Sequence, residues 1–177
     1  MNSERYSALA ELFTYPAEDY RTSVQECEHL EPAIAEFHAA IAPLPTAELQ
    51  ELFTRAFDLN PVCCLEIGWH LFGENYERGA LLVRMRQELR LHGITESSEL
   101  PDHLSQVLRL LARMEPERAR DFAGACVLPA LEKMLAAFSG TENPFRSLLL
   151  AVRQVMRGDY PEMLLSQEPA PVLRVLS

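Results

Sequence analysis

The segment from Glu99 to Leu104, with the sequence Glu-Leu-Pro-Asp-His-Leu, contains three ionisable side chains within five residues. The imidazole of His103 follows the carboxylates of Glu99 and Asp102. Such an acidic patch can hold Arg or Lys side chains of a ligand through charge-assisted hydrogen bonds. A structural interpretation stays equally open, in which Pro101 opens a helix and Asp102 stabilises the positive end of that helix.

A second candidate region surrounds the only tryptophan of the chain, Trp69, which stands beside His70 and shortly before Phe72. It is preceded by the polar helix break Asp58-Leu59-Asn60-Pro61. Aromatic residues at helical spacing commonly belong to the core. Amphipathic rings next to a polar turn also make good anchors for a partner, so both roles remain candidates.

The sequence predicts no catalytic centre, no metal site and no bound cofactor. The five histidines do not form an HExxH motif or another i, i+4 ligand pair. A phosphate-binding glycine loop and a GxSxG motif are also missing from the sequence. The adjacent Cys63 and Cys64 do not form a CxxC motif, and we expect Cys27, Cys63, Cys64 and Cys126 to be free, structural thiols.

The charge distribution excludes several partners and favours another. The net charge is −10, and residues 1–60 carry 11 acidic against 3 basic side chains. Such a field repels nucleic acid and anionic membranes and would attract a basic peptide. An ordinary solvated surface is an equally open interpretation of these charges. The N-terminus does not resemble a secretory signal, and no apolar run reaches the roughly 18 residues that span a bilayer. We therefore expect a cytoplasmic protein without membrane insertion.

Helical periodicity extends along most of the chain and must position these groups. We predict a single-domain, all-α bundle of about eight helices over residues 1–157, followed by an irregular tail over residues 158–177. Proline and glycine mark the helix boundaries, with helices expected to stop at Gly73, Gly93, Gly140 and Gly158. Pro129 lies inside a helical pattern, where it should kink the helix.

In several segments the chain resembles the assembly chaperones of molybdoenzymes. Among these chaperones it is most similar to the nitrate reductase delta-subunit type. The similar stretches are Leu52 to Pro61, His70 to Gly73, Glu77-Arg78-Gly79, and Glu99 to Leu104, and the opening Leu12 to Pro16 also fits. Their combination in this order is specific, and the resemblance covers roughly residues 5–112.

The resemblance implies an all-helical chaperone without catalysis. Its partner would be the N-terminal peptide of a molybdopterin-containing catalytic subunit, of nitrate reductase or a related molybdoenzyme, bound before cofactor insertion and before membrane docking or export. Cofactor-delivery proteins are further candidate partners. Carried onto this sequence, the peptide-binding positions are Asp58, Asn60, Pro61, Trp69, His70, Phe72, Glu99, Pro101, Asp102 and His103.

The expected mechanism is the docking of an amphipathic helix into a groove. Trp69 and Phe72 would provide apolar anchors, while Glu99, Asp102 and the acidic first third would attract basic residues. Two alternatives remain: a regulatory or scaffold subunit of a stable redox-enzyme complex, and a metal-dependent helical enzyme.

Overall fold

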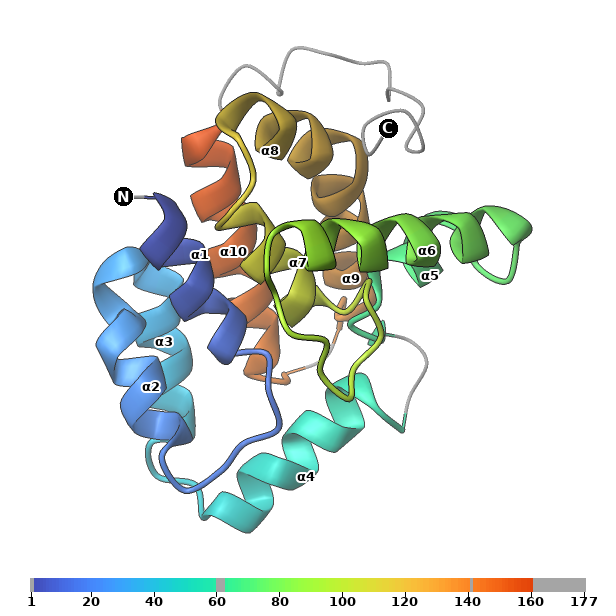
Figure 1. Ribbon diagram of the computed structural model, residues 1–177. Helices are drawn as coiled ribbons and strands as arrows, with labels where there is room; N and C mark the ends of the chain where they lie inside the picture. Colours follow the sequence, from blue (N-terminus) through green and yellow to red (C-terminus); the bar gives the residue numbers. More distant parts are fainter. Residues whose placement is uncertain (1, 60–62, 141, 161–177) are drawn as a thin grey trace.

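The computed structural model describes residues 2–59, 63–140 and 142–160, and within these ranges it is all-α (Figure 1). The α-helices are α1 (Asn2–Glu11), α2 (Tyr20–Cys27), α3 (Pro32–Ile41), α4 (Thr46–Phe57), α5 (Ile67–Phe72), α6 (Tyr76–Leu91), α7 (Leu104–Leu111), α8 (Pro116–Phe122), α9 (Leu128–Ala137) and α10 (Phe145–Asp159). A 3₁₀ turn, η1 (Glu28–Leu30), follows α2.

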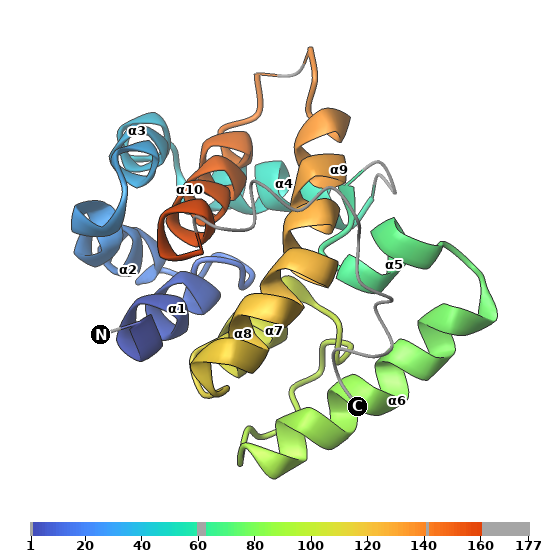
Figure 2. The same cartoon turned by 90° about the horizontal axis from the view of Figure 1, so that it is seen from above.

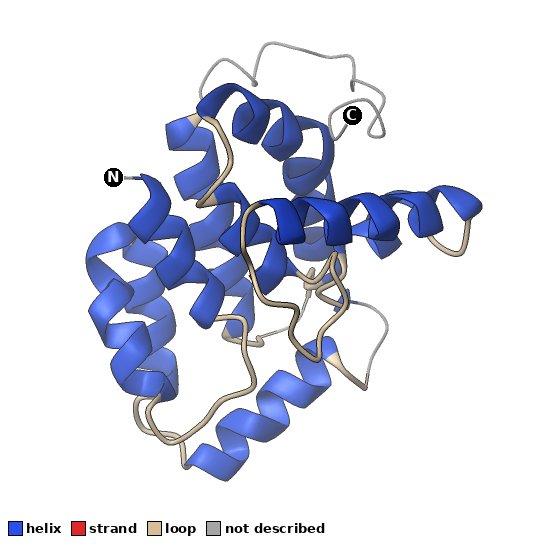
Figure 3. Ribbon diagram, in the orientation of Figure 1, coloured by secondary structure: helices blue, strands red, loops and turns tan. Residues whose placement is uncertain are grey.

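The described ranges contain no β-strand, in agreement with the predicted fold class (Figure 3). About eight helices were expected. The described residues form ten α-helices, of which α8 and α9 are joined without interruption by a π-helical turn. None of these helices combines the length and the apolar character of a bilayer-spanning segment.

The π-helical turn η3 (Ala123–Val127) explains how the long helix accommodates Pro129. The Leu128 amide donates to the Ala123 carbonyl, five residues back instead of four. A proline inside an α-helix lacks the amide for the i→i−4 bond, and its ring crowds the preceding turn. A kink was predicted at Pro129, and the structure shows a π turn directly before this proline.

The core lies where the central helix α10 packs against α3 on one side and α9 on the other (Figure 2). Phe145, the first residue of α10, is fully buried among aromatic rings. Its ring centroid lies 5.0 Å from that of Phe37, 5.4 Å from that of Phe53 and 5.3 Å from that of Phe57. Such pairs each contribute about 1 kcal/mol beyond area burial, and they tie α3, α4 and α10 together.

Glycines end helices at the predicted places, with one exception. Gly73 after α5 and Gly93 after α6 have φ values of 58° and 64°, a left-handed conformation that costs glycine little. Gly158 does not stop the last helix, which continues to Asp159. Arg5 of α1 pairs with Asp159 at 2.9 Å, and this contact stabilises the last turn. Residues 161–177, where an irregular tail was predicted, lie outside the described residues.

Two regions of the molecule lie apart. Helices α2 and α3 form one side, and the α5–α6 pair forms the other (Figures 1 and 2). Helix α5 packs against α6 and α9, and it carries the tryptophan that the sequence singled out.

Candidate functional site

The backbone joins the two segments that the sequence singled out. The Ile67 amide donates to the Asp102 carbonyl at 2.9 Å, and the Leu104 amide donates to the Leu65 carbonyl at 2.8 Å. These bonds flank an isolated antiparallel bridge between Glu66 and His103. The start of α5 and the turn before α7 therefore form one unit, although they lie far apart in the sequence.

Asp102 caps a different helix from the one that its sequence position suggested. Its Oδ2 atom accepts a hydrogen bond of 3.0 Å from the amide of Gly68, the second residue of α5. Together with the Ile67 bond, Asp102 satisfies the first two amides of α5, which no residue of α5 itself can reach. Of the two interpretations left open by the sequence, the structural one needs a change: the hydrogen bonds of Asp102 go to the start of α5 and not to the start of α7.

Helix α7 begins later than predicted, at Leu104, and His103 is its N-cap. The Nδ1 atom of His103 accepts from the Ser105 amide at 3.3 Å. The preceding residues form a turn in which the His103 amide donates to the Leu100 carbonyl at 3.0 Å. Pro101, which is buried, contributes its restricted φ to this turn and not to the helix.

The Asp102 carboxylate is fully buried and incompletely satisfied. Its Oδ2 atom lies 3.8 Å from Nε of Arg78. Among the described residues, Oδ1 of Asp102 and Nε of Arg78 have no hydrogen-bond partner. Burial raises the pKa of Asp102 to about 6, and the nearby charge of Arg78 opposes that rise. The carboxylate is not accessible to a ligand in this conformation.

Gly68 is a site residue that sequence reasoning missed. A Cβ atom at this position would lie 2.6 Å from Oδ2 of Asp102 and 3.0 Å from Cδ2 of Leu81. Only glycine lets the backbone of α5 approach the carboxylate this closely. A glycine inside a short helical pattern was the available signal, since such a glycine commonly has a packing reason.

Trp69 is partly exposed and lies beside the same cluster. The guanidinium carbon of Arg78 is 5.5 Å from the centroid of its ring, within cation–π range. Phe72 is also partly exposed, and it packs against the hydrophobic core. Arg78 therefore connects the tryptophan with the buried Asp102.

The other end of α5 is stabilised by the only lysine of the chain. Nζ of Lys133, in α9, donates to the His70 carbonyl at 2.6 Å, where the negative end of the helix favours a cation. The ring of His70 lies near the N-terminal side of α5, where its Nε2 atom is 2.8 Å from the Cys64 carbonyl oxygen. Burial lowers the pKa of His70. The contact with the Cys64 carbonyl gives the His70 ring a structural role.

Three carboxylates gather around His103, and we call Asp58, Glu66 and Glu99 the acidic rim. Oε2 of Glu99 lies 4.0 Å from Nε2 of His103. Desolvation raises the pKa of Asp58, and the negative charges of Glu99 and Glu66 raise it further. Burial lowers the pKa of His103, whereas the three carboxylates of the rim oppose that shift. The rim concentrates negative charge where the two segments meet.

Two leucines adjoin the acidic rim in sequence and are open to solvent. Leu59, next to Asp58, is 77% exposed, and Leu100, next to Glu99, is 42% exposed. Apolar side chains beside carboxylates suit a ligand that is both apolar and basic. Glu66 was not among the predicted positions, because its place beside Asp58 and Glu99 depends on the chain pairing described above.

The predicted positions thus separate into groups. Asp58, Glu99 and His103 meet at the acidic rim, and Trp69 lies next to Asp102 through Gly68 and Arg78. The His70 ring lies against the Cys64 carbonyl, and Phe72 packs against the hydrophobic core. Asn60 and Pro61 lie outside the described residues.

The described residues contain no group of three or more His, Cys, Asp or Glu side chains that could hold a metal ion. All four cysteines are free, and Cys64 alone is partly exposed. Its Sγ atom lies 3.7 Å from Nε2 of His70. Burial nevertheless raises the pKa of Cys64 to about 12, so the thiol stays protonated at neutral pH and is a poor nucleophile.

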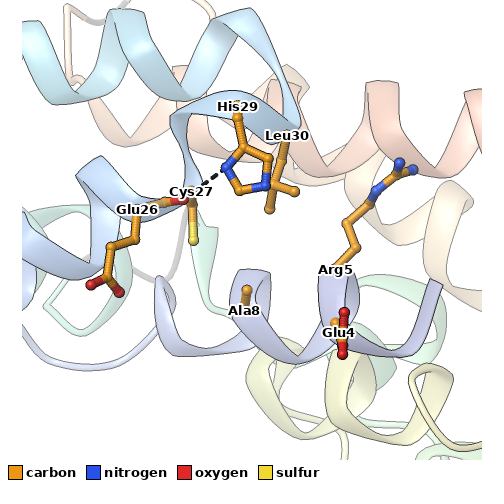
Figure 4. Close-up of a pocket in the computed structure, with 7 residues that line it drawn as sticks. All are labelled: Glu4, Arg5, Ala8, Glu26, Cys27, His29 and Leu30. Carbon is orange, nitrogen blue, oxygen red and sulfur yellow. Dashed lines mark hydrogen bonds between the residues drawn. The ribbon is translucent and has the colours of Figure 1, made fainter. Parts of the chain in front are cut away.

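A hollow of about 490 Å³ lies between α1 and the segment formed by α2 and η1 (Figure 4). It is lined by Glu4, Arg5, Ala8, Glu26, Cys27, His29 and Leu30. Arg5 is engaged with Asp159, and Nδ1 of His29 is 2.9 Å from the Glu26 carbonyl. Burial raises the pKa of the Cys27 thiol to about 11. Cys27 is therefore not an activated nucleophile, and no other residue that lines the hollow is a thiol or a hydroxyl.

The family match and the similar proteins both point to nitrate reductase assembly proteins. Residues 24–146 match the family described as nitrate reductase delta subunit. Two similar proteins, from Escherichia coli strain K12 and Escherichia coli O157:H7, are both described as nitrate reductase molybdenum cofactor assembly chaperone NarJ. Each is 26% identical over 117 residues, which cover 66% of this chain and 45% of the relative. The match thus spans less than half the length of these relatives.

Proposed function

The chain belongs to the nitrate reductase delta subunit family, and we propose that it is a non-catalytic assembly chaperone for molybdenum cofactor insertion into nitrate reductase or a related molybdoenzyme. We further propose that it binds the N-terminal segment of the catalytic subunit before that subunit docks at the membrane or is exported. The client stays bound until the cofactor is in place.

One observation carries the proposal for binding. The acidic rim joins Asp58 and Glu99, which come from two of the family-like stretches, and exposed Leu59 and Leu100 adjoin it in the sequence. A basic amphipathic peptide complements such a surface, because its cations approach the carboxylates while its apolar face covers the leucines. Partly exposed Trp69 provides an aromatic contact nearby.

The chemistry of this surface suits release as well as capture. The ordering of a disordered segment costs several kcal/mol, about 2 to 5, which limits the affinity. Carboxylates at an exposed rim act mainly on the association rate and on its dependence on salt. A client held in this way exchanges readily once its own folding buries the bound segment.

The test is calorimetric titration of the full chain with synthetic N-terminal peptides from molybdoenzyme catalytic subunits. The double variant Asp58→Asn with Glu99→Gln should weaken binding about tenfold or more and reduce its salt dependence. The matched control is Glu115→Gln with Glu117→Gln, two exposed carboxylates at the start of α8 and outside the acidic first third. It removes the same charge and should leave binding nearly unchanged. Equal effects of the two double variants would exclude the acidic rim as the binding surface.

A second experiment distinguishes a chaperone from a permanent subunit. A chaperone should copurify with the catalytic subunit before cofactor insertion and be absent from the mature enzyme. A stoichiometric presence in the mature enzyme would contradict the proposal and favour a scaffold subunit.

A further inference from the structure

Helix α5 is too short to be stable without its neighbours. It has six residues, whereas isolated helices below roughly 12 to 15 residues are marginal in water. Its position must therefore depend on contacts from elsewhere in the chain. Asp102 provides two of them at the N-terminal end, through its carbonyl to Ile67 and its carboxylate to Gly68.

The carboxylate of Asp102 also reaches Trp69 through a second route. Nε of Arg78 lies 3.8 Å from Oδ2 of Asp102, and its guanidinium carbon lies 5.5 Å from the ring centroid of Trp69. Trp69 is the neighbour of Gly68, so the backbone of α5 and the side chain of Arg78 both connect the ring with Asp102. A change at the carboxylate therefore reaches the tryptophan by two paths.

The geometry points to Asp102 as a positioning residue: the charge state of its buried carboxylate sets the placement of Trp69 through the Gly68 amide and Arg78. Asp102 is fully buried, so it acts on a bound client through Trp69 and not by direct contact. The consequence for client binding rests on the function proposed above. The placement of Trp69 itself does not.

The carboxylate is poised to change its charge state within the range of cellular pH. Its Oδ1 atom makes no hydrogen bond in the described part of the chain, and burial raises the pKa of Asp102 to about 6. Arg78 of α6 lowers this pKa, and Glu66, directly before α5, raises it. His103 follows Asp102 in the chain, with Glu99 and Asp58 close to that ring.

Protonation removes the negative charge that attracts Arg78. It also weakens the acceptor of the Gly68 amide, because a neutral carboxyl oxygen accepts less strongly than a carboxylate oxygen. Both changes loosen α5 and free the guanidinium of Arg78 from one of its partners. Trp69 should then sit in a different environment below the transition than above it.

The chain contains its own reporter, since Trp69 is its only tryptophan. We would record the emission of the full wild-type chain without a client from about pH 4.5 to about pH 8, a range that brackets a midpoint near the raised value. The emission should shift in a single transition. Asp102→Asn keeps an oxygen acceptor for the Gly68 amide and should abolish the transition. A pH-independent wild type, or a transition that persists in Asp102→Asn, would overturn the inference.

Two further variants test it even if Asp102→Asn does not fold. Arg78→Gln removes the cation that favours the charged carboxylate, so the midpoint should move to higher pH. Glu66→Gln removes a repelling carboxylate, so the midpoint should move to lower pH. Opposite shifts support the inference, and shifts of the same sign or unchanged midpoints refute it.

Peptide titration of the same proteins separates the two proposals. If no client peptide binds but the Trp69 transition behaves as described, the proposed function fails and the positioning role stands. If peptides bind but the transition is insensitive to Asp102, the positioning role fails alone.

Discussion

A methyl group on Gly68 would lie 2.6 Å from an Asp102 carboxylate oxygen, so this position of α5 has no room for a side chain. Gly68→Ala should therefore force α5 away from the turn before α7. Overpacking of this kind typically costs about 1 to 3 kcal/mol. We expect a loss of this size in the free energy of unfolding, measured by urea denaturation.

Gly79→Ala is the matched control. Gly79 lies within α6, and a Cβ atom there would meet nothing within 4 Å. Alanine in a helix interior is more favourable than glycine by up to about 1 kcal/mol, so this variant should be neutral or more stable. An equal loss of stability in both variants would show that the close approach of Gly68 to Asp102 is unimportant.

Asp102 should make stability depend on pH in a defined direction. Burial raises its pKa to about 6 in the folded chain, whereas an unfolded Asp has a pKa of about 3.9. Between these values the folded state binds more protons. The contribution of Asp102 to the free energy of unfolding is therefore present below about pH 4 and is lost as the pH rises to about 6.

Asp102→Asn removes this titration and serves as the reference. The stability of the wild type relative to Asp102→Asn should fall by about 2 to 3 kcal/mol between about pH 4 and pH 6. Urea denaturation of both proteins at a series of pH values measures the difference, in which the other titrating groups largely cancel. A difference that is constant with pH would rule out a raised pKa at Asp102.

The Glu88–Arg118 ion pair should contribute more than an exposed pair of the same chemistry. The side chain of Glu88 is 7% exposed, and its Oε1 atom lies 2.9 Å from Nη2 of Arg118. Arg118→Ala leaves the buried carboxylate with the weaker contact to His92 at 3.5 Å. We expect a loss of about 2 kcal/mol, below the roughly 3 to 5 kcal/mol for a fully buried pair, because the side chain of Arg118 is 41% exposed.

The exposed pair of Glu51 and Arg55 provides the comparison. Their side chains are 59% and 67% exposed, and solvent-screened pairs contribute about 0.5 kcal/mol or less. Arg55→Ala should therefore hardly change the urea midpoint. A similar loss in Arg55→Ala and Arg118→Ala would mean that burial does not determine the strength of these pairs.

The thiols should resist modification in the folded protein. Burial raises the pKa of Cys27 to about 11 and those of Cys63, Cys64 and Cys126 to about 12, and the thiolate is the reactive species. With a thiol-specific chromogenic disulfide at about pH 8, we expect only slow reaction, beginning at the partly exposed Cys64. Cys64→Ser should remove that first phase, and all four thiols should react in concentrated guanidinium chloride. Rapid reaction of the folded wild type would contradict these assignments.

Local pattern predicted most of the helices correctly, because the burial of one helix face imposes a 3.6-residue period on the sequence itself. In α10, Phe145, Leu148, Leu149, Val152 and Met156 are all buried as their spacing indicated. A disturbance of the helix near Pro129 was expected from the missing amide of proline, but the π turn that forms there was not predicted. At Gly158 the prediction was one residue short, because α10 continues to Asp159.

The candidate site was only partly predictable. The sequence marked Trp69, Glu99 and Asp102 by residue type, and the family that the chain resembled is confirmed by the match over residues 24–146. Their roles as peptide-binding residues remain predictions. Gly68 and Glu66 escaped notice, because their importance arises from a chain pairing that leaves no local signal.

The sequence by itself thus determined the all-α fold class and the approximate helix boundaries, since both depend on residues within a few turns of one another. Only the tertiary structure decided which helix Asp102 would cap. A carboxylate before a helix can satisfy amides of its own helix or of any other helix start within reach. The backbone bonds between Leu65–Ile67 and Asp102–Leu104 bring the start of α5 to Asp102, and His103 is left to cap α7.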